Sequence, residues 1–184
     1  EAYFHLRVAS EISKRGYASF FDELSYGGRI QYYPVLFDYI LAFFMLFLDP
    51  ILVLKIIPTI IMSSIVFIVY LLSKYLSQDV RSALFCAALS GFIPLVFREI
   101  LNKVSVYSLV LPLVFWYIYF FLRIKEHKKY LFYFLAFSFL LPLTSPSAFL
   151  IVIAMVFYVI FLTIESFKMS NIRKEGLIFS MFLI

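Results

Sequence analysis

The first fifteen residues of the chain carry apolar side chains at helical spacing. Phe4, Val8 and Ile12 recur every four residues, with polar and charged residues between them. This spacing places the three apolar side chains on one face and predicts an amphipathic helix over residues 2–15. Gly16 follows directly and is a typical stop signal at the C-terminal end of a helix.

The next apolar segment, residues 34–48, is shorter than a membrane span. It follows a polar loop with the turn signal Gly27–Gly28, contains Asp38, and ends at Asp49–Pro50. As a helix it would be about 22 Å long, whereas the hydrocarbon core of a bilayer is about 30 Å thick. We therefore expect a re-entrant or interfacial segment, with a full span as the alternative.

The rest of the chain consists of apolar runs separated by short polar loops. Runs of about 20 apolar residues are typical of transmembrane helices. The expected spans are residues 51–72, 80–97, 104–122, 131–143 and 148–164, with the start of another at 177–184. We predict an all-α fold, in which a polytopic transmembrane helical bundle over 51–184 follows a first loop over 1–50 with amphipathic and re-entrant or interfacial helices. Because the last apolar run is cut short, we expect the chain to be part of a larger protein.

One expected span carries a repeat of small residues. Ala83, Ala87 and Gly91 recur every four residues and therefore share one helical face. Small side chains on such a face allow the backbones of two membrane helices to approach closely. We expect this face to pack against a neighbouring helix.

Composition favours a membrane protein over a soluble one. The chain is 64% hydrophobic and 15% charged, against roughly 45–50% and 25% in a soluble domain, and its mean hydropathy is +0.99. The net charge of +5 comes from Lys and Arg in loops, which indicates topology rather than nucleic-acid binding. The single cysteine, Cys86, rules out an intrachain disulfide and a thiolate metal cluster.

The loop charges predict an orientation in the membrane. The most basic loops, 123–129 and 166–175, bracket two apolar segments and are expected on the cytoplasmic side, together with 73–82. The basic residues of 125–129 have two interpretations: they are first a signal of membrane topology, and second a contact with anionic lipid. The loops 98–103 and 144–147 then lie on the other side.

Residues 1–50 lie outside if 34–48 does not span, and residues 1–33 are cytoplasmic if it does. Charge alone leaves both placements open, because four acidic residues there balance four basic ones. The short length of 34–48 favours the outside. We expect an integral membrane protein in the plasma membrane of a prokaryote, archaeal or bacterial, since the high Ile, Phe, Tyr and Lys content is typical of an AT-rich genome.

Candidate chemistry is concentrated at the start of the chain. Glu1, His5 and Arg7 place a carboxylate, an imidazole and a guanidinium within seven residues. Such a set can bind a metal, a phosphate or a sugar, whereas the alternative is a solvated helix start at which the helix dipole favours an acid. Asp38 and the pair Arg98–Glu99 are further candidates, because burial of Asp38 is costly and Arg98–Glu99 follows a span on the side expected for Glu1. Interface anchoring is the alternative for Arg98.

These motifs resemble, in order and over most of the chain, the GT-C superfamily of membrane glycosyltransferases. The run 1–7 (EAYFHLR) is similar to the first external loop of oligosaccharyltransferase catalytic subunits, and also to the Asp-Glu element of protein O-mannosyltransferases and aminoarabinose transferases. Tyr33–Pro34, the span end 70–74 (YLLSK) and the segment 92–98 (FIPLVFR) follow in the same order. The family resemblance implies that the first loop lies outside the cytoplasm and contains partly horizontal helices.

The resemblance also implies roles for individual residues. An acidic residue of the first loop either coordinates a divalent cation, Mg²⁺ or Mn²⁺, or acts as the catalytic base. Glu1 matches this position, although in the Asp-Glu families the base would be the residue before the start of this chain. His5 and Arg7 are then candidates for binding the lipid-linked phosphate, with an interfacial histidine as the favoured alternative for His5, and Asp38 is a candidate for the acceptor site. Arg98–Glu99 is a candidate for either.

The chain departs from oligosaccharyltransferases at their second acidic motif. Ser105, Val106 and Tyr107 stand there, and these side chains cannot replace two carboxylates around a hard cation. The departure favours a single-sugar transferase. We expect transfer of a sugar from a polyprenyl- or dolichyl-phosphate donor to a protein, glycan or lipid acceptor on the extracytoplasmic side. The alternative is a non-catalytic membrane subunit of a larger complex. A transporter ranks third, because no charged residue sits at the centre of an expected span.

Overall fold

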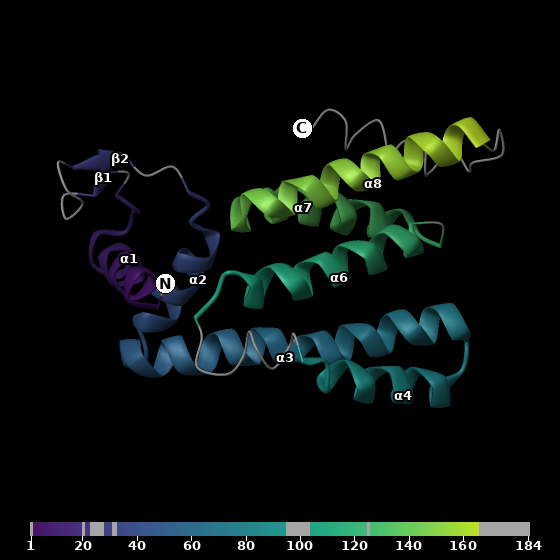
Figure 1. Cartoon of the computed structure of the whole chain (residues 1–184), viewed down its shortest axis with the longest axis horizontal. Coiled ribbons are helices and arrows are strands. Elements are labelled where there is room, and N and C mark those ends of the chain that lie inside the picture. Colours follow the sequence, from purple (N-terminus) through teal and green to yellow (C-terminus); the bar gives the residue numbers. More distant parts are fainter. Residues whose placement is uncertain are drawn as a thin grey trace.

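The prediction of an all-α fold is confirmed by a computed structural model, which describes residues 2–19, 21–22, 28–30, 33–94, 104–124 and 126–165. The helices are α1 (Ala2–Arg15), α2 (Leu36–Met45), α3 (Pro50–Ser77), α4 (Val80–Gly91), α6 (Tyr107–Arg123), α7 (Lys128–Thr144) and α8 (Pro146–Glu165). Between α1 and α2, the two-residue strands β1 (Phe21–Asp22) and β2 (Arg29–Ile30) pair antiparallel. Figure 1 shows α3, α6, α7 and α8 running along the long axis, with α1 and α2 at one end.

The long helices pack as consecutive neighbours. Helix α3 lies against α4 and α6, α6 lies against α7, and α7 lies against α8. Helices α1 and α2 pack on each other beside the first turns of α3, where Val53 and Ile57 belong to the same apolar core as Val8 and Leu41. The start of α3 and the two short helices therefore form one end of the bundle (Figure 1).

Aspartates cap the N-terminal ends of both α3 and α4. Asp49 accepts hydrogen bonds from the first backbone N–H groups of α3, and Pro50 occupies the first turn. Helix α3 ends at Gln78, which adopts a left-handed conformation with φ 57°. The next residue, Asp79, caps α4 by accepting from the backbone N–H groups of Arg81 and Ser82.

The small-residue face of α4 packs as expected. Ala83 and Ala87 are buried, and a Cβ on Gly91 would lie 3.5 Å from Cγ2 of Val66 on α3. Helix α4 nevertheless ends at Gly91, earlier than the predicted span 80–97. Pro94 explains this early end, because a proline inside a helix removes a hydrogen bond and clashes with the preceding turn.

The other predicted spans correspond to α3, α6, α7 and α8 with shifted ends, whereas residues 177–184 lie outside the described part of the chain. The segment expected to be short is the ten-residue helix α2. Among the described helices, α3 alone is long and apolar enough to cross a membrane by length and composition. It has 28 residues, or about 42 Å at 1.5 Å per residue. Segments 36–45, 80–91, 107–123 and 146–160 are shorter apolar helices.

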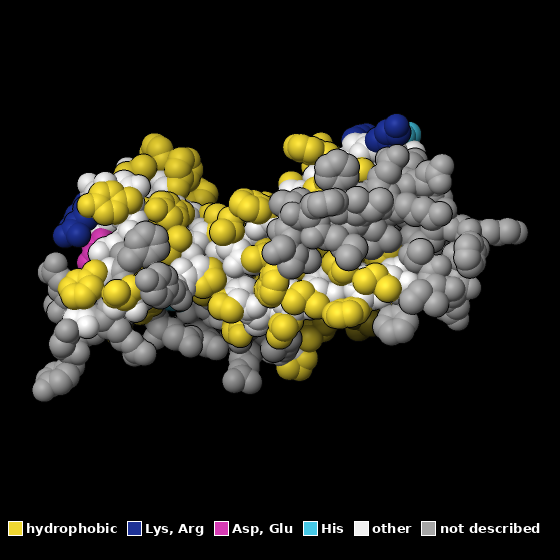
Figure 2. Space-filling view, turned by 90° about the horizontal axis from the view of Figure 1, so that it is seen from above, with side chains coloured by type: hydrophobic (Ala, Val, Ile, Leu, Met, Phe, Trp, Pro, Cys, Tyr) yellow, Lys and Arg dark blue, Asp and Glu magenta, His cyan; other side chains and the backbone are white. Residues whose placement is uncertain are grey.

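Much of the surface is apolar. Figure 2 shows hydrophobic side chains along the face that it presents. On α3 and α4, the exposed large side chains include Ile60, Phe67, Leu84, Phe85 and Leu89. Soluble monomers rarely expose large contiguous apolar surface, so these faces require a covering environment.

Candidate functional site

A buried hydrogen bond between His5 and Asp38 joins α1 to α2. Nδ1 of His5 and Oδ1 of Asp38 lie 2.7 Å apart, although the residues are 33 positions apart in the sequence. His5 is 7% exposed and Asp38 is 0% exposed. Two candidates identified separately in the sequence therefore form one site.

The helical periodicity of α1 explains why His5 is buried. The buried residues of α1 are His5, Val8, Ala9 and Ile12, which follow the spacing i, i+3, i+4 and i+7 of a single face. The sequence-based face began instead at Phe4, which is only half-buried. The position of His5 three, four and seven residues before Val8, Ala9 and Ile12 was the sequence signal that predicts its burial.

Asp38 lies on the buried face of α2. That face consists of Phe37, Asp38, Leu41 and Ala42, so the carboxylate is surrounded in sequence by apolar neighbours. Two further contacts hold α2 near α1. Ser10 Oγ lies 3.9 Å from Met45 Sδ, and the backbone N–H of Ala18 donates to the Tyr39 hydroxyl at 3.1 Å.

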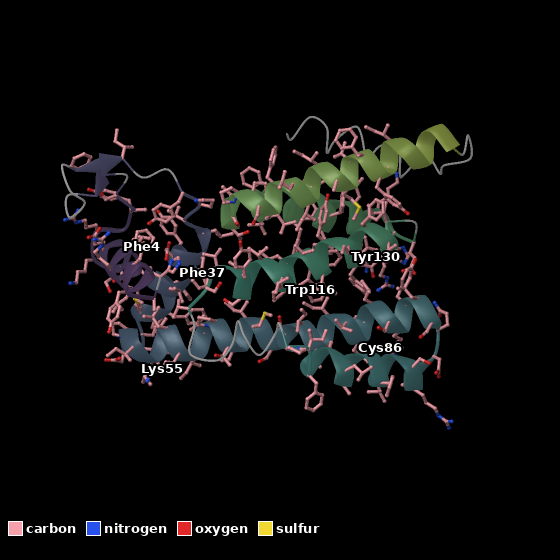
Figure 3. The ribbon with its side chains drawn as sticks, viewed as in Figure 1. Phe4, Phe37, Lys55, Cys86, Trp116 and Tyr130 are labelled. Carbon is pink, nitrogen blue, oxygen red and sulfur yellow. The ribbon has the colours of Figure 1, made fainter. Side chains whose placement is uncertain are left out.

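Aromatic rings enclose the imidazole. Phe4 and Phe37, both labelled in Figure 3, meet the His5 ring edge-to-face at centroid distances of 5.5 and 5.3 Å. Phe4 also packs against Tyr33 at 5.2 Å. Because these rings exclude water, the hydrogen bond to Asp38 is stronger than it would be at an exposed site.

The contact with Asp38 fixes the orientation of the imidazole. When Nδ1–H donates to a carboxylate, the neutral ring carries its proton on Nδ1 and its lone pair on Nε2. Nε2 is then available as a proton acceptor. Within the described part of the chain, the second carboxylate oxygen of Asp38, Oδ2, is buried without a hydrogen-bond partner. The site therefore has an unused acceptor atom next to an oriented imidazole.

Arg7 lies close to this site on α1. Its guanidinium carbon is 5.8 Å from the centroid of the Phe4 ring, which is one of the rings that pack on His5. Arg7 is half-buried. A guanidinium here is suited to a phosphate, because its fork of N–H groups matches phosphate oxygens.

The remaining predicted site residues are not placed. Glu1, Arg98 and Glu99 lie outside the described residues, so the catalytic and metal-binding roles of Glu1 stay predictions. Within the ranges that the structure describes, no group of three or more His, Cys, Asp or Glu side chains could hold a metal ion.

Ser105 contributes to the start of α6. The Ser105 hydroxyl accepts a hydrogen bond from the backbone N–H of Tyr107 at 3.2 Å. The Ser105 carbonyl accepts from the Ser108 hydroxyl at 2.8 Å. Ser105 is buried, whereas Tyr107 is exposed. Ser105 thus stabilises a helix end, which is an ordinary structural role for serine.

No family model, curated protein or solved structure matches the chain.

Proposed function

We propose that the protein is a polytopic membrane glycosyltransferase of the GT-C type, which moves a sugar from a polyprenyl- or dolichyl-phosphate carrier to an extracytoplasmic acceptor. The observation that carries the proposal is the buried hydrogen bond between His5 and Asp38. Burying a carboxylate is costly unless it is paired and hydrogen-bonded, and His5 is the side-chain partner that the structure shows for Asp38. Both residues belong to the helices before α3, where the resemblance implies that GT-C enzymes keep their acid–base group.

Two features support the polytopic part of the proposal. Helix α3 is long enough to span, and α6 and α7 have 17 residues each, or about 26 Å, which approaches the thickness of the hydrocarbon core. The exposed apolar faces of α3 and α4 would be covered by lipid. The proposed location is the plasma membrane of a prokaryote.

The position of α1 and α2 relative to the loops predicted to be cytoplasmic supports an extracytoplasmic α1 and α2. Lys74, Arg81, Lys128 and Lys129 lie at the end of α3, the start of α4 and the start of α7. Figure 1 places these helix ends opposite α1 and α2. The positive-inside rule predicts that the loops 73–82 and 123–129 face the cytoplasm, so His5 and Asp38 would face outward.

In the proposed reaction, the acceptor hydroxyl attacks the anomeric carbon of the sugar. A bond forms between the acceptor oxygen and that carbon, while the bond from the carbon to the phosphate oxygen breaks. The polyprenyl phosphate leaves with the electron pair of the broken bond. Nε2 of His5 takes the hydroxyl proton, and the Asp38 carboxylate stabilises the resulting imidazolium through Nδ1–H. In this proposal the acceptor meets Nε2 of His5, and Asp38, which is fully buried, acts through the imidazole.

Two further residues have proposed roles. Arg7 holds the leaving phosphate, whose charge grows as the bond breaks. Glu1 either shares the base function or binds a divalent cation, as the resemblance implies. The proton-transfer step above uses His5 and Asp38 alone.

The test is sugar transfer by the full chain in membranes, with short-chain polyprenyl-phosphate hexoses as donors. We expect His5→Gln to lower kcat roughly 10²–10⁴-fold, as loss of a general base does, and Asp38→Asn to lower it as well. The matched controls are His127→Gln and Asp79→Asn, which replace exposed residues far from the site. Wild-type activity in both His5→Gln and Asp38→Asn would refute their proposed role.

The alternative is a non-catalytic membrane subunit that keeps the GT-C scaffold. The structural use of Ser105 at the start of α6 favours it, because that position carries a second acid in oligosaccharyltransferases. This alternative predicts that the wild-type chain transfers no sugar from any tested donor. It also predicts that Asp38→Asn changes only stability. Separate substitution of Glu1 and of the residue preceding it completes the test, since a catalytic acid at either position would abolish transfer.

A further inference from the structure

We propose that the end of the bundle opposite α1 and α2 binds the head groups of anionic phospholipids. This surface, the basic end, consists of the α3–α4 turn and the α6–α7 turn. Its cationic side chains in the described part of the chain are Lys74, Arg81, Arg123, Lys128 and Lys129, with His127 beside them. The proposal requires only that the bundle lies in a bilayer, and it is independent of any glycosyltransferase activity.

Contacts between the helix ends build the basic end as one surface. The Tyr75 hydroxyl at the end of α3 donates a hydrogen bond to the Leu122 carbonyl of α6 at 3.0 Å. The Arg123 guanidinium lies 5.9 Å from the Tyr75 ring, 5.5 Å from the Tyr119 ring and 4.6 Å from the Tyr130 ring. Arg123 therefore joins α3, α6 and α7. Tyr130 is labelled near this end of the bundle in Figure 3.

Arg123 has a structural role in this surface. It donates hydrogen bonds to the Tyr119 hydroxyl at 2.6 Å and to the Glu126 carboxylate at 2.8 Å. These partners and the three tyrosine rings fix the guanidinium, and Glu126 offsets its charge. The head groups must therefore bind the lysines around it.

Lys128 and Lys129 are the principal binding residues. Both are exposed in the first turn of α7, and the side chain of the N-cap residue His127 makes no capping hydrogen bond. The first backbone N–H groups of a helix have no partner within the helix and attract anions. Lys128 and Lys129 lie in the same first turn of α7 as these N–H groups.

Tyrosine rings lie beside the lysine side chains. Lys129 Nζ is 5.4 Å from the Tyr130 ring, and Lys74 Nζ is 5.8 Å from the Tyr70 ring. Tyrosine rings with adjacent lysines are typical of the membrane–water interface, where the ring lies at the head-group level and the amine extends into water. This pairing occurs on both α3 and α7.

Charge and apolar surface together favour a lipid over a nucleic acid. The five cations are accompanied by two carboxylates, Asp79 and Glu126, among the described residues of these turns. About one turn beyond the cations, towards the middle of the bundle, Leu84 on α4 and Phe132 on α7 are exposed. A basic rim bordered by apolar side chains matches a phospholipid, which presents an anionic head group above acyl chains.

The single tryptophan provides the assay. Trp116 lies on α6, labelled in Figure 3, and is the chain's only tryptophan. The purified full chain in neutral detergent is titrated with dibrominated phosphatidylglycerol or dibrominated phosphatidylcholine, and quenching of Trp116 fluorescence is measured. We expect phosphatidylglycerol to quench at lower concentration. This preference should fall as salt is raised, because the interaction is electrostatic.

The decisive variant is Lys128→Gln with Lys129→Gln. A basic residue near an anionic surface contributes about five-fold in affinity, so the double variant should lose roughly ten- to thirty-fold in apparent affinity for phosphatidylglycerol. The matched control is Lys14→Gln with Arg15→Gln, which removes the same charge from exposed positions at the end of α1. It should retain the preference.

Three results would overturn the proposal. Equal quenching by the two lipids would remove the preference for anionic head groups. Equal losses of affinity for phosphatidylglycerol in the double variant and in its control would show that net charge alone, and not the basic end, determines the preference. Displacement of phosphatidylglycerol by single-stranded polyuridylate at equal phosphate concentration would assign the surface to nucleic acid.

Discussion

Separate replacement of His5 and Asp38 by alanine should have unequal effects on stability. The two side chains share one buried hydrogen bond of 2.7 Å, but His5 can be neutral whereas Asp38 is a carboxylate with 0% exposure. His5→Ala leaves that carboxylate buried without a partner, which costs about 3–5 kcal/mol. Asp38→Ala removes one hydrogen bond to a charged group, which costs about 1.5–3 kcal/mol. Loss of the histidine is therefore expected to be worse.

The double variants separate stability from chemistry. The double variant His5→Ala with Asp38→Ala should lose less free energy of unfolding than the two single variants lose together. The difference, a coupling energy of about 2 kcal/mol, arises because both substitutions break the same hydrogen bond. In His5→Leu with Asp38→Leu, apolar side chains fill the interface. Replacing a buried ion pair in this way is often neutral or stabilising by about 1–4 kcal/mol. A stable but inactive leucine variant would assign the pair to function.

The assay is equilibrium unfolding of the full chain in mixed micelles, followed by circular dichroism. Ser10→Ala is the control, because the Ser10 side chain lies in the same interface and its 3.9 Å contact with the Met45 sulfur is weak. It should change the free energy of unfolding by less than about 0.5 kcal/mol. A coupling energy below about 0.5 kcal/mol, or a larger loss for Asp38→Ala than for His5→Ala, would refute the reasoning.

Three further predictions concern the bundle. Ala87→Leu should destabilise the packing of α4 on α3 by about 1–3 kcal/mol, because Ala87 is 7% exposed and overpacking strains a close interface; Leu84→Ala, on the exposed face, should have little effect by the same unfolding assay. Hydrogen bonds from the side chain and backbone of Ser82, and from the backbone of Arg81, lower the pKa of Asp79 below its ordinary 3.8, so its stabilising effect should be present above that pH and be lost as pH falls below it. The free energies of unfolding of the wild type and of Asp79→Asn, measured over a series of pH values, should become equal only in acid. In a Cys86→Ala background, a cysteine at position 25 should react with an impermeant thiol reagent in intact cells. If it reacts only after the cells are lysed, the loop lies in the cytoplasm.

Local signals in the sequence were sufficient to predict the helices and several of their ends. The spacing of Val8 and Ile12 predicts α1, and Gly16 adopts the positive φ expected at its end. The small face of Ala83 and Ala87 predicts the packing side of α4. These features could be predicted because helical periodicity and capping depend on residues within a few positions of one another. The early end of α4 before Pro94 was missed because the apolar run continues past it.

The pairing of residues from different helices was decided only by the tertiary structure. His5 and Asp38 were each candidates from their residue types, but nothing in a single sequence relates positions 33 residues apart. The same holds for Arg123, which joins Tyr75, Tyr119 and Tyr130 across three helices. Helical periodicity states which face of each helix is buried, whereas the partner of that face depends on how all the helices pack together. The sequence therefore determined the candidate groups, and the packing of α1 on α2 determined that two of them form one site.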